Sequence, residues 1–453
     1  MRVIVAGAGR IGYSIAEELA FEGHNLTVID RDADNCRNIS ESLDVSVVNG
    51  NAASCEVLED AGAQGTDLLI AVTQADETNL IICLTAKKMG VKHTIARVRS
   101  HDYYGQLSLL KNELGLSMTI NPEEATAGEI SRILRFPSAQ KVEPFAKGRA
   151  ESVEFRIPAQ SALCGLKISD FSSTFREHVL ICAVQRGQEV TIPRGDFVLA
   201  AGDRLNVVGS YRQISSFLKK VCGNMREIRS VIVLGGGMTC HYLVGSLINA
   251  GISVKIIERS EERCSELKNE FPKAQMVLAD GRKSNVLLEE GLENADAFIT
   301  ITGDDDDNVI TSLYALSMGV KKVVTQIKET HIIRLLENNG LDTIFQPCAV
   351  ATQYIVQYVR SMQNAYDNNK MESLYHTFEG KVEIMEFRIT SNFEAIGIPL
   401  KKLKIDREAL IAAIIRDGNC IIPSGDDAIR SGDGVIVATT QNGVIGLDDL
   451  LEA

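Results

Sequence analysis

Three glycines close to the start of the chain have the spacing of a dinucleotide-binding loop: residues 7–12, GAGRIG, fit the pattern G-x-G-x-x-G. An apolar, β-branched run precedes them at residues 2–6 and a helical pattern follows, which is the setting that this motif requires. Gly7 would allow a tight turn, Gly9 would let a phosphate approach the backbone, and Gly12 would let the helix pack closely on the strand. The start of that helix would offer free N–H groups and a partial positive charge to the phosphate.

Other polar residues follow the next predicted strands, at the sheet edge where open α/β folds bind ligands. Asp30 ends the second strand, where its carboxylate can accept hydrogen bonds from both ribose hydroxyls of an adenosine and would repel a 2′-phosphate. This favours NAD or another adenosine ligand over NADP. Asn51 could touch the adenine edge or cap the next helix. Thr73 and Gln74 end a later strand, and Arg97 ends the strand after that, where its guanidinium could neutralise phosphates.

The whole arrangement recurs in the second half of the chain. Residues 2–32 align without a gap on residues 230–260, so that Gly7 falls on Gly235 and Asp30 on Glu258. After a one-residue insertion, residues 69–99 continue to match the second copy, with Thr73 on Thr302. Asp280 falls on Asn51, with the same two alternatives of adenine contact or capping.

The second copy departs from the first at three positions. Cys240 occupies the place of the third glycine, Met238 that of Arg10, and Gln326 that of Arg97. The carboxylate of Glu258 is kept, but two cations that could neutralise phosphates are missing. We therefore expect a second pocket that is weaker or that prefers a ligand with less phosphate charge. A Rossmann unit with a purely structural role is the alternative.

Candidate metal sites are less well supported. The acidic run at residues 304–307 could hold Ca²⁺ or Mg²⁺, but capping of a helix that begins near Asn308 is favoured, because the equivalent residues 74–77 include only two acids. The ten cysteines form no C-x-x-C pair, and the seven histidines have no metal-ligand spacing. We expect reduced structural thiols and no metal site.

Segments 151–220 and 382–450 also correspond. They share F-R-I, a glycine-containing hairpin and the turn I-P-x-G-D. The fold class is therefore α/β, with two Rossmann-like parallel-sheet units, each followed by a small β-rich α+β subdomain with one or two short helices. The expected domains are 1–136 and 226–360 for the Rossmann-like units, and 137–225 and 361–453 for the β-rich subdomains. Linkers are expected near 137–149, 221–229 and 361–380.

Composition narrows the function. Lys and Arg number 47 against 60 Asp and Glu, giving a net charge of −13 with no basic cluster, which disfavours nucleic acid as a partner. No apolar run approaches the length of a membrane span, and strand-like sequence starts at Arg2, so a soluble chain is expected. No histidine recurs between the β-rich segments, and no G-x-S-x-G, H-E-x-x-H or G-x-x-x-x-G-K-[ST] motif is present. Duplicated binding units without duplicated acid–base groups favour sensing over catalysis, and an NAD-dependent oxidoreductase with duplicated Rossmann domains is the alternative.

The order of segments resembles the tandem RCK (regulator of potassium conductance) family of bacterial Trk potassium uptake regulators, over essentially the whole chain. The resemblance rests on VIVAGAGRIG…LTVIDRD, on AVTQADETNLIICLTAKKMGVKHTIARV, and on the I-P-x-G-D turns with a downstream G-D. It implies a cytoplasmic regulatory subunit, peripheral on the inner face of the membrane, that gates a potassium-translocating subunit of TrkH or TrkG type. It also implies binding of NAD(H), with ATP or ADP as further candidates, and a homo-oligomeric ring of two or four chains. A nucleotide-binding protein that serves another transporter is a third hypothesis.

By the same resemblance, the ligand contacts of the first unit map onto Gly7, Ala8, Gly9, Arg10, Ile11, Asp30, Thr73, Gln74 and Arg97. Through the repeat, those of the second unit map onto Gly235, Gly236, Gly237, Met238, Thr239, Glu258 and Thr302.

Overall fold

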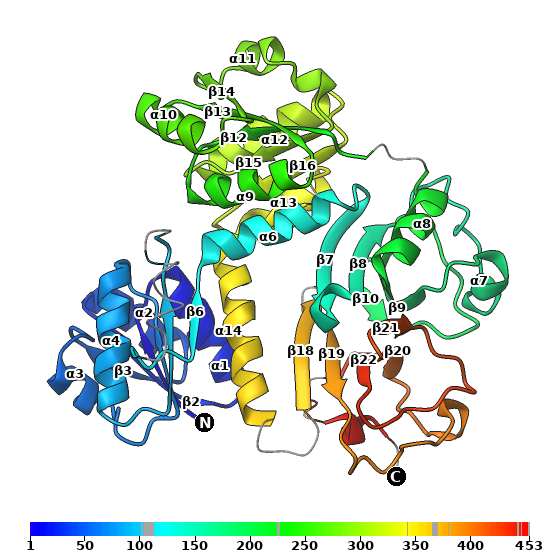
Figure 1. The fold of residues 1–453 in the computed structure, drawn as a ribbon, viewed down its shortest axis with the longest axis horizontal. Helices are drawn as coiled ribbons and strands as arrows, with labels where there is room; N and C mark the ends of the chain where they lie inside the picture. The colour runs from blue at the N-terminus through cyan, green and yellow to red at the C-terminus, as the bar shows by residue number, and fades with distance from the viewer. Residues whose placement is uncertain are drawn as a thin grey trace. The chain divides into compact units, whose positions relative to one another are not determined.

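The computed structural model describes residues 1–100, 103, 113–223, 227–341, 343–364, 370–378, 380–441, 444 and 446–451 (Figure 1). Its backbone groups into two compact units that differ from the halves of the repeat. Unit 1 consists of residues 1–127, 326–328 and 345–356, and unit 2 of residues 128–325, 329–344 and 357–453. The four domain boundaries expected from the sequence stay a prediction.

A parallel six-stranded sheet forms the first Rossmann-like unit, with the strand order β3-β2-β1-β4-β5-β6. Its strands are β1 (Arg2–Ala6), β2 (Asn25–Asp30), β3 (Ser46–Asn49), β4 (Leu68–Ala71), β5 (His93–Arg97) and β6 (Met118–Ile120). Its helices are α1 (Arg10–Phe21), α2 (Ala33–Ser42), α3 (Cys55–Asp60), α4 (Asp76–Lys88) and α6 (Pro122–Leu134). The strand order reverses between β1 and β4, which creates the crevice where this fold class binds nucleotides.

Continuous apolar runs explain why these strands form a parallel sheet. All four residues of β4 are buried, as are the last four of β1, because helices cover both faces of such a sheet. Side chains of α4, including Ile82, Cys83 and Ala86, pack with Ile4 and Leu69 in one apolar core. The core therefore fixes the ends of β1 and β4, and with them the position of the glycine loop.

The second Rossmann-like unit repeats this architecture, with the order β14-β13-β12-β15-β16-β17. Its strands are β12 (Ser230–Leu234), β13 (Ser253–Glu258), β14 (Gln275–Leu278), β15 (Ala297–Thr300), β16 (Lys322–Gln326) and β17 (Ile344–Phe345). Its helices are α9 (Met238–Asn249), α10 (Glu261–Glu270), α11 (Ser284–Glu289), α12 (Asp305–Ser317), α13 (Ile333–Asn338) and α14 (Pro347–Asn364), with short 3₁₀ turns η2 (Leu292–Asn294) and η3 (Thr330–Ile332). The predicted duplication of the fold is confirmed.

Each β-rich subdomain contains a five-stranded antiparallel sheet, with the orders β10-β9-β11-β8-β7 and β18-β19-β22-β20-β21. The first has β7 (Ala139–Phe145), β8 (Ala150–Arg156), β9 (Leu180–Arg186), β10 (Glu189–Thr191) and β11 (Arg204–Gly209), with η1 (Ala146–Gly148), α7 (Ile168–Thr174) and α8 (Tyr211–Val221). The second has β18 (Lys370–Thr377), β19 (Val382–Arg388), β20 (Ala409–Arg416), β21 (Asn419–Ile421) and β22 (Gly434–Thr439), with the 3₁₀ turns η4 (Leu400–Lys402) and η5 (Leu447–Leu450).

Two of the predicted linkers are wrong. Residues 139–145 and 370–377 are edge strands, because β7 and β18 pair antiparallel with β8 and β19. Both strands mix polar with apolar residues, and Gln140 and Glu143 of β7 are buried, so the polar pattern does not mark an exposed linker. Residues 224–226 of the linker at 221–229, and residues 365–369 and 379 of the last one, lie outside the described residues. The expected helices occur in the first subdomain, whereas the described part of the second has 3₁₀ turns instead.

The two β-rich subdomains share one apolar core within unit 2. Phe145, Cys182 and Val208 of the first subdomain pack in the same buried cluster as Ile384, Ala413 and Ile436 of the second. Backbone N–H of Ala146 also donates to Oε2 of Glu386 at 2.9 Å. No helix in the described part of the chain is both long enough and apolar enough to span a bilayer.

Candidate nucleotide-binding pockets

A cavity of about 640 Å³ lies at the carboxyl ends of the strands of the first Rossmann-like unit. Its walls include nearly all the ligand contacts predicted for this unit: Gly7, Gly9, Arg10, Ile11, Asp30, Asn51, Thr73, Gln74 and Arg97. Ala8 is buried and does not line the cavity, but its backbone N–H donates to Oδ2 of Asp30 at 2.5 Å. The structure thus brings together residues that lie up to 90 positions apart in the sequence.

Space around the glycine loop matches the role expected for each glycine. Gly7 has a φ of 108°, and a Cβ there would lie 3.0 Å from the backbone carbon of Val72. A Cβ on Gly12 would lie 1.8 Å from the carbonyl oxygen of Gly7, so helix α1 packs too closely on β1 for any side chain. A Cβ on Gly9 would meet nothing within 4 Å, which leaves room for a ligand over the start of α1.

Asp30 is held rigidly at the edge of this cavity. Its Oδ2 accepts from Ala8 N–H and its Oδ1 accepts from Asp32 N–H at 2.8 Å. These bonds attach the carboxylate to the glycine loop on one side and to the start of α2 on the other. Each carboxylate oxygen has a further lone pair, so the group can still accept from ribose hydroxyls.

Three arginines give the first cavity a basic wall. Arg10, Arg31 and Arg97 line it, against the two carboxylates of Asp30 and Asp32. The Arg97 side chain is only 14% exposed, and one of its terminal nitrogens lies 3.9 Å from Oε1 of Glu123. Burial lowers the pKa of Arg97 from its usual value, with Glu123 acting in the opposite direction. A guanidinium in this setting can bind a phosphate through two parallel hydrogen bonds.

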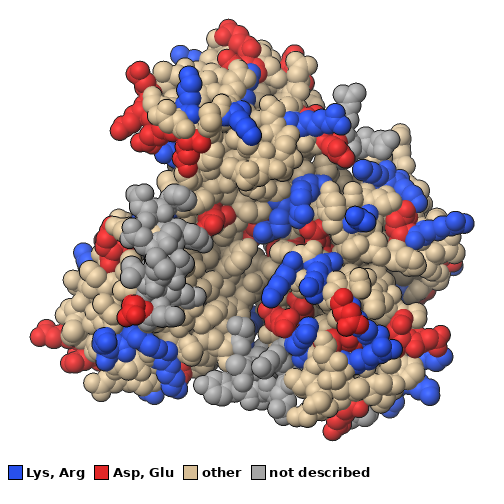
Figure 2. Space-filling model, in the orientation of Figure 1, with Lys and Arg blue, Asp and Glu red and all other residues tan. Residues whose placement is uncertain are grey.

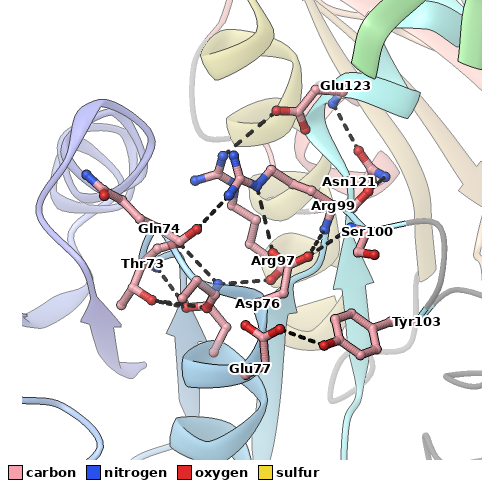
Figure 3. A network of polar contacts seen from close by, with 12 residues as sticks. Thr73, Gln74, Asp76, Glu77, Arg97, Arg99, Ser100, Tyr103, Asn121 and Glu123 are labelled. Atoms are coloured by element: carbon pink, nitrogen blue, oxygen red, sulfur yellow. Dashed lines mark hydrogen bonds and ion pairs between the residues drawn. The ribbon is translucent and has the colours of Figure 1, made fainter. Parts of the chain in front are cut away.

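The repeated T-x-x-D-x-x-N segment has a structural role beside this cavity (Figure 3). Oδ1 of Asn79 accepts from the N–H and the hydroxyl of Thr73 at 2.8 and 2.7 Å, and its Nδ2 donates to the carbonyl of Arg97 at 2.9 Å. Oδ2 of Asp76 accepts from the N–H groups of Arg99 and Ser100 at 2.8 Å each. The segment therefore fixes the ends of β4 and β5, where Thr73 and Arg97 face the ligand space.

The corresponding residues of the second unit form similar hydrogen bonds. Oδ1 of Asn308 accepts from the N–H and the hydroxyl of Thr302 at 3.0 and 2.7 Å, and Oδ2 of Asp305 accepts from Glu329 N–H at 3.0 Å. The resemblance to the RCK family rests partly on this segment, and the structure supplies a physical reason for its recurrence. Its reason is that a buried amide and a carboxylate hold two strand ends together.

One wall of the first cavity comes from a residue that the sequence analysis missed. Cys348, in the first turn of α14, lines the cavity with residues of the first Rossmann-like unit. Burial raises the pKa of its thiol, with Arg10 and Arg97 acting in the opposite direction. No local signal in the sequence places Cys348 here, because it is more than 200 residues beyond the strands that form the rest of the cavity.

A second cavity, of about 430 Å³, occupies the equivalent place in the second Rossmann-like unit. The predicted contacts that line it are Gly235, Gly236, Gly237, Glu258, Asp280 and Thr302. Met238 is half-buried and Thr239 is buried in the first turn of α9, and neither is among the lining residues. Cys240 is fully buried, and burial raises the pKa of its thiol to about 12.

Glu258 repeats the anchoring of Asp30. Its Oε2 accepts from Gly236 N–H at 2.6 Å, and its Oε1 accepts from the N–H groups of Arg259 and Ser260 at 2.8 Å each. Nε of Arg263 donates to the carbonyl of Gly236 at 2.6 Å and supports the glycine loop from behind. Arg263 is a cation that replaces Asn35 of the first unit, and its charge is offset by Glu266, 2.6 Å away.

Asp280 and Asn51 both cap a turn, but neither occupies the N-cap position of the next helix. Oδ1 of Asn51 accepts from Ala53 N–H at 3.2 Å and from Arg31 at 3.0 Å, whereas Ser54 is the residue that precedes α3. Asp280 binds Arg282 through both carboxylate oxygens, at 2.8 and 2.9 Å. This contact lowers the pKa of Asp280 to about 2. Both residues line their cavities, which keeps contact with an adenine edge open.

The acidic run at residues 304–307 caps a helix, as favoured, but the helix begins earlier than expected. Helix α12 starts at Asp305 rather than near Asn308, and Oδ1 of Asp304 accepts from Asp307 N–H at 3.0 Å. Among the described residues no group of three or more His, Cys, Asp or Glu is placed to hold a metal ion. Figure 2 shows that acidic side chains also gather on the surface over α10 and α11 of this unit.

Comparisons with known proteins agree with this architecture. The TrkA-N domain matches residues 3–122 and 231–347, and the TrkA-C domain matches residues 153–221 and 384–452. The Trk system potassium uptake protein TrkA homolog of Archaeoglobus fulgidus is 33% identical over 437 residues, covering 96% of this chain and 97% of its own. The Trk system potassium uptake protein TrkA of Haemophilus influenzae is 28% identical and covers 96% and 95%.

Solved structures show the same fold at low sequence identity. The crystal structure of the GsuK RCK domain has a TM-score of 0.63 at 18% identity, covering 97% of this chain and 92% of that chain. The GsuK channel bound to NAD has a TM-score of 0.62 at 17% identity, covering 97% and 77%.

Proposed function

The chain belongs to the TrkA family, and from that premise we propose that it is the nucleotide-sensing regulatory subunit of a Trk-type potassium uptake system. In this proposal it binds NAD(H), with ATP or ADP as further ligands of the first pocket. It acts at the cytoplasmic face of the membrane, where it gates a potassium-translocating subunit of TrkH or TrkG type.

The observation that carries the proposal is the composition of the two pockets. Each combines a glycine loop with an anchored ribose-side carboxylate, Asp30 in one and Glu258 in the other. Neither wall, in the part of the chain that the structure describes, contains a histidine, lysine or tyrosine. These are the usual acid–base partners of hydride transfer, so the pockets are better suited to binding a nucleotide than to turning it over.

The chain's connectivity supports a route from the first pocket to the other compact unit. Residues 122–127 of α6 belong to unit 1 and residues 128–134 to unit 2, and α14 is divided in the same way after Val356. Glu123, in the first turn of α6, is the ion-pair partner of Arg97 in the first pocket. A phosphate that binds Arg97 would therefore act on a helix that continues into the other unit. A ligand shifts such an equilibrium only by its difference in affinity for the two states.

Assembly into a homo-oligomer, of two or four chains, is part of the proposal. An exposed isoleucine recurs at the same position of the repeat, Ile81 on α4 and Ile310 on α12, with 52% and 65% of its surface exposed. Single exposed apolar side chains are common on protein surfaces, so it is the recurrence at equivalent positions that makes this surface our candidate for contacts between chains. Light scattering of the Ile81→Glu/Ile310→Glu variant should give a smaller mass than the unmodified chain, whereas an unchanged mass would remove this surface from the proposal.

The proposal is tested on the purified full-length chain. It should bind NADH and ATP in calorimetric titrations and should consume no NADH across a panel of carbonyl substrates. Sustained substrate-dependent NADH oxidation would favour the oxidoreductase alternative. Co-purification with a Trk-type pore subunit, together with a growth defect at limiting potassium on deletion of the gene, would separate a Trk regulator from a nucleotide-binding protein of another transporter.

A further inference from the structure

We propose that the second pocket selects nucleotides by the charge at the end of the ligand distal to the adenine, and that it takes NAD⁺ in preference to NADH and to ATP. This inference rests on the proposed nucleotide binding and specifies the ligand of one of the two pockets. The discriminating residues are Asp304 and Asp307, which line the second cavity.

The strand order sets the direction in which a dinucleotide lies in this cavity. Strand β12, which leads into the glycine loop, is flanked by β13 on one side and β15 on the other. Glu258 ends β13, so the adenosine ribose belongs on that side and the phosphates belong over the glycine loop. The distal nucleoside then reaches the end of β15, where Thr302 leads into the loop that carries Asp304.

Both carboxylates are absent from the first pocket. The repeat places Ala75 at the position of Asp304 and Thr78 at that of Asp307, and both of these residues line the first cavity. Asp304 is exposed and Asp307 is half-buried, with Asp304 accepting a hydrogen bond from the backbone of Asp307. Substitution at two equivalent positions of the repeat therefore accounts for the extra acids of the second pocket, and a different loop conformation does not.

The cations of the second pocket do not cancel this charge. Arg259 and Arg282 face four carboxylates in its wall, whereas three arginines face two carboxylates in the first pocket. Arg282 is also held by both oxygens of Asp280. Its pKa is raised mainly by this contact, with smaller contributions from Asp307 and Asp304. The second cavity is therefore acidic and the first is basic.

NAD⁺ and NADH are nearly the same in shape but differ by one unit of charge on the nicotinamide ring. The oxidised ring is a pyridinium cation, which carboxylates attract, and hydride addition makes it neutral. ATP carries several negative charges where NAD⁺ places its distal nucleoside, so the same carboxylates repel it. The second pocket thus distinguishes the oxidised from the reduced cofactor without performing the redox reaction.

The test uses the full-length chain with the first pocket weakened by Arg10→Ala/Arg97→Ala. Calorimetric titrations should give a dissociation constant for NAD⁺ about threefold to tenfold below that for NADH, with ATP weakest. Adding Asp304→Asn/Asp307→Thr should bring the NADH/NAD⁺ ratio close to one and strengthen ATP binding. Asn keeps the ability to cap α12, and Thr is the residue of the first pocket at that site.

Two controls separate pocket charge from effects on the fold. Asp306→Asn removes an exposed acid of the same run that does not line the cavity, and it should leave the NADH/NAD⁺ ratio unchanged. The reciprocal variant Ala75→Asp/Thr78→Asp, in the otherwise unmodified chain, should transfer the preference for NAD⁺ to the first pocket. Circular-dichroism melting of each variant establishes that the chain is folded.

Each outcome has a distinct meaning. Equal binding of NAD⁺ and NADH by the chain with Asp304 and Asp307 intact would overturn the inference and leave the proposed function standing. Loss of all nucleotide binding on weakening the first pocket alone would also overturn the inference, because the second pocket would then take no nucleotide. Absence of binding by the unmodified chain would overturn the proposed function as well.

Discussion

Gly236 leaves the space that Glu258 occupies. A Cβ added at Gly236 would lie 3.0 Å from Cδ1 of Leu267 and 3.1 Å from Oε2 of Glu258, and this oxygen already accepts a hydrogen bond from Gly236 N–H. In the first pocket the same two positions are Ala8 and the shorter Asp30. The length of the ribose-side acid and the size of the loop residue beside it have therefore changed together between the two copies.

The Gly236→Ala substitution should destabilise the second Rossmann-like unit by about 1 kcal/mol, because the added methyl group must displace the end of the Leu267 side chain and a carboxylate that is fixed by three backbone N–H groups. Adding Glu258→Asp should recover the part of this loss that comes from the carboxylate, since it recreates the pair found in the first pocket. Chemical denaturation measures both effects. Ala8→Gly, at the equivalent position of the first unit, is the matched control. A Gly236→Ala chain as stable as the parent would show that the residue types at positions 236 and 258 are independent.

Arg97→Ala should weaken nucleotide binding to the first pocket by about 1–3 kcal/mol, because a charge-assisted contact to phosphate is lost from a partly buried site. Calorimetric titration with ATP measures the change. Arg37→Ala, which removes an exposed arginine paired with Asp34 on the surface of α2, is the control and should have no effect. Unchanged ATP affinity in Arg97→Ala would mean that the side chain is structural.

Asn79→Ala should lower the free energy of unfolding by about 1–3 kcal/mol, since it leaves the N–H and hydroxyl of Thr73 and the carbonyl of Arg97 without their partner. Denaturant titration gives the value. Asn38→Ala, an exposed asparagine within α2, is the matched control. A loss no larger than that of the control would contradict the role assigned to the T-x-x-D-x-x-N segment.

Stability should fall as the pH rises from about 4.5 to about 8, through Glu129 of α6. Burial, and next the charge of Glu143, raise its pKa to about 8, while Arg132 and Lys141 act in the opposite direction. Between its unfolded and folded pKa values only the folded chain keeps the proton, so each pH unit in this interval costs about 1.4 kcal/mol at most. Below pH 4.5 both states are protonated, and the full contribution is present.

Glu129→Gln should remove this slope and make the chain more stable than the parent at pH 8. Thermal melting at pH 5, 6.5 and 8 compares the two proteins. Glu124→Gln, at a less buried position of the same helix, controls for the general effect of removing a charge. Parallel pH profiles for Glu129→Gln and the parent would contradict the assignment.

The fold could be predicted from the sequence because its signals are local and duplicated. Apolar runs, the glycine loop and the acid at the end of β2 each specify one element, and the second copy confirms them. Most residues that line the first pocket could also be predicted, because the carboxyl ends of parallel strands meet at one edge of the sheet.

Other features could not be predicted because they depend on packing between distant segments. Cys348 reaches the first cavity through the placement of α14, and the division into units assigns residues 345–356 of the second half to the unit that contains the first pocket. The strands β7 and β18 have mixed polar patterns that only their pairing with β8 and β19 explains. Cutting the chain between its repeats would therefore break a compact unit, and the pockets are better compared by point variants.

The most direct measurement is a calorimetric titration of the full-length chain with ATP, beside the same titration of the Arg97→Ala chain. Two unequal pockets predict one class of tighter site per chain, which weakens in the variant, and a second class that is far weaker and unchanged. Two equal sites per chain, or the absence of any binding heat together with an unchanged melting temperature in ATP, would contradict the account.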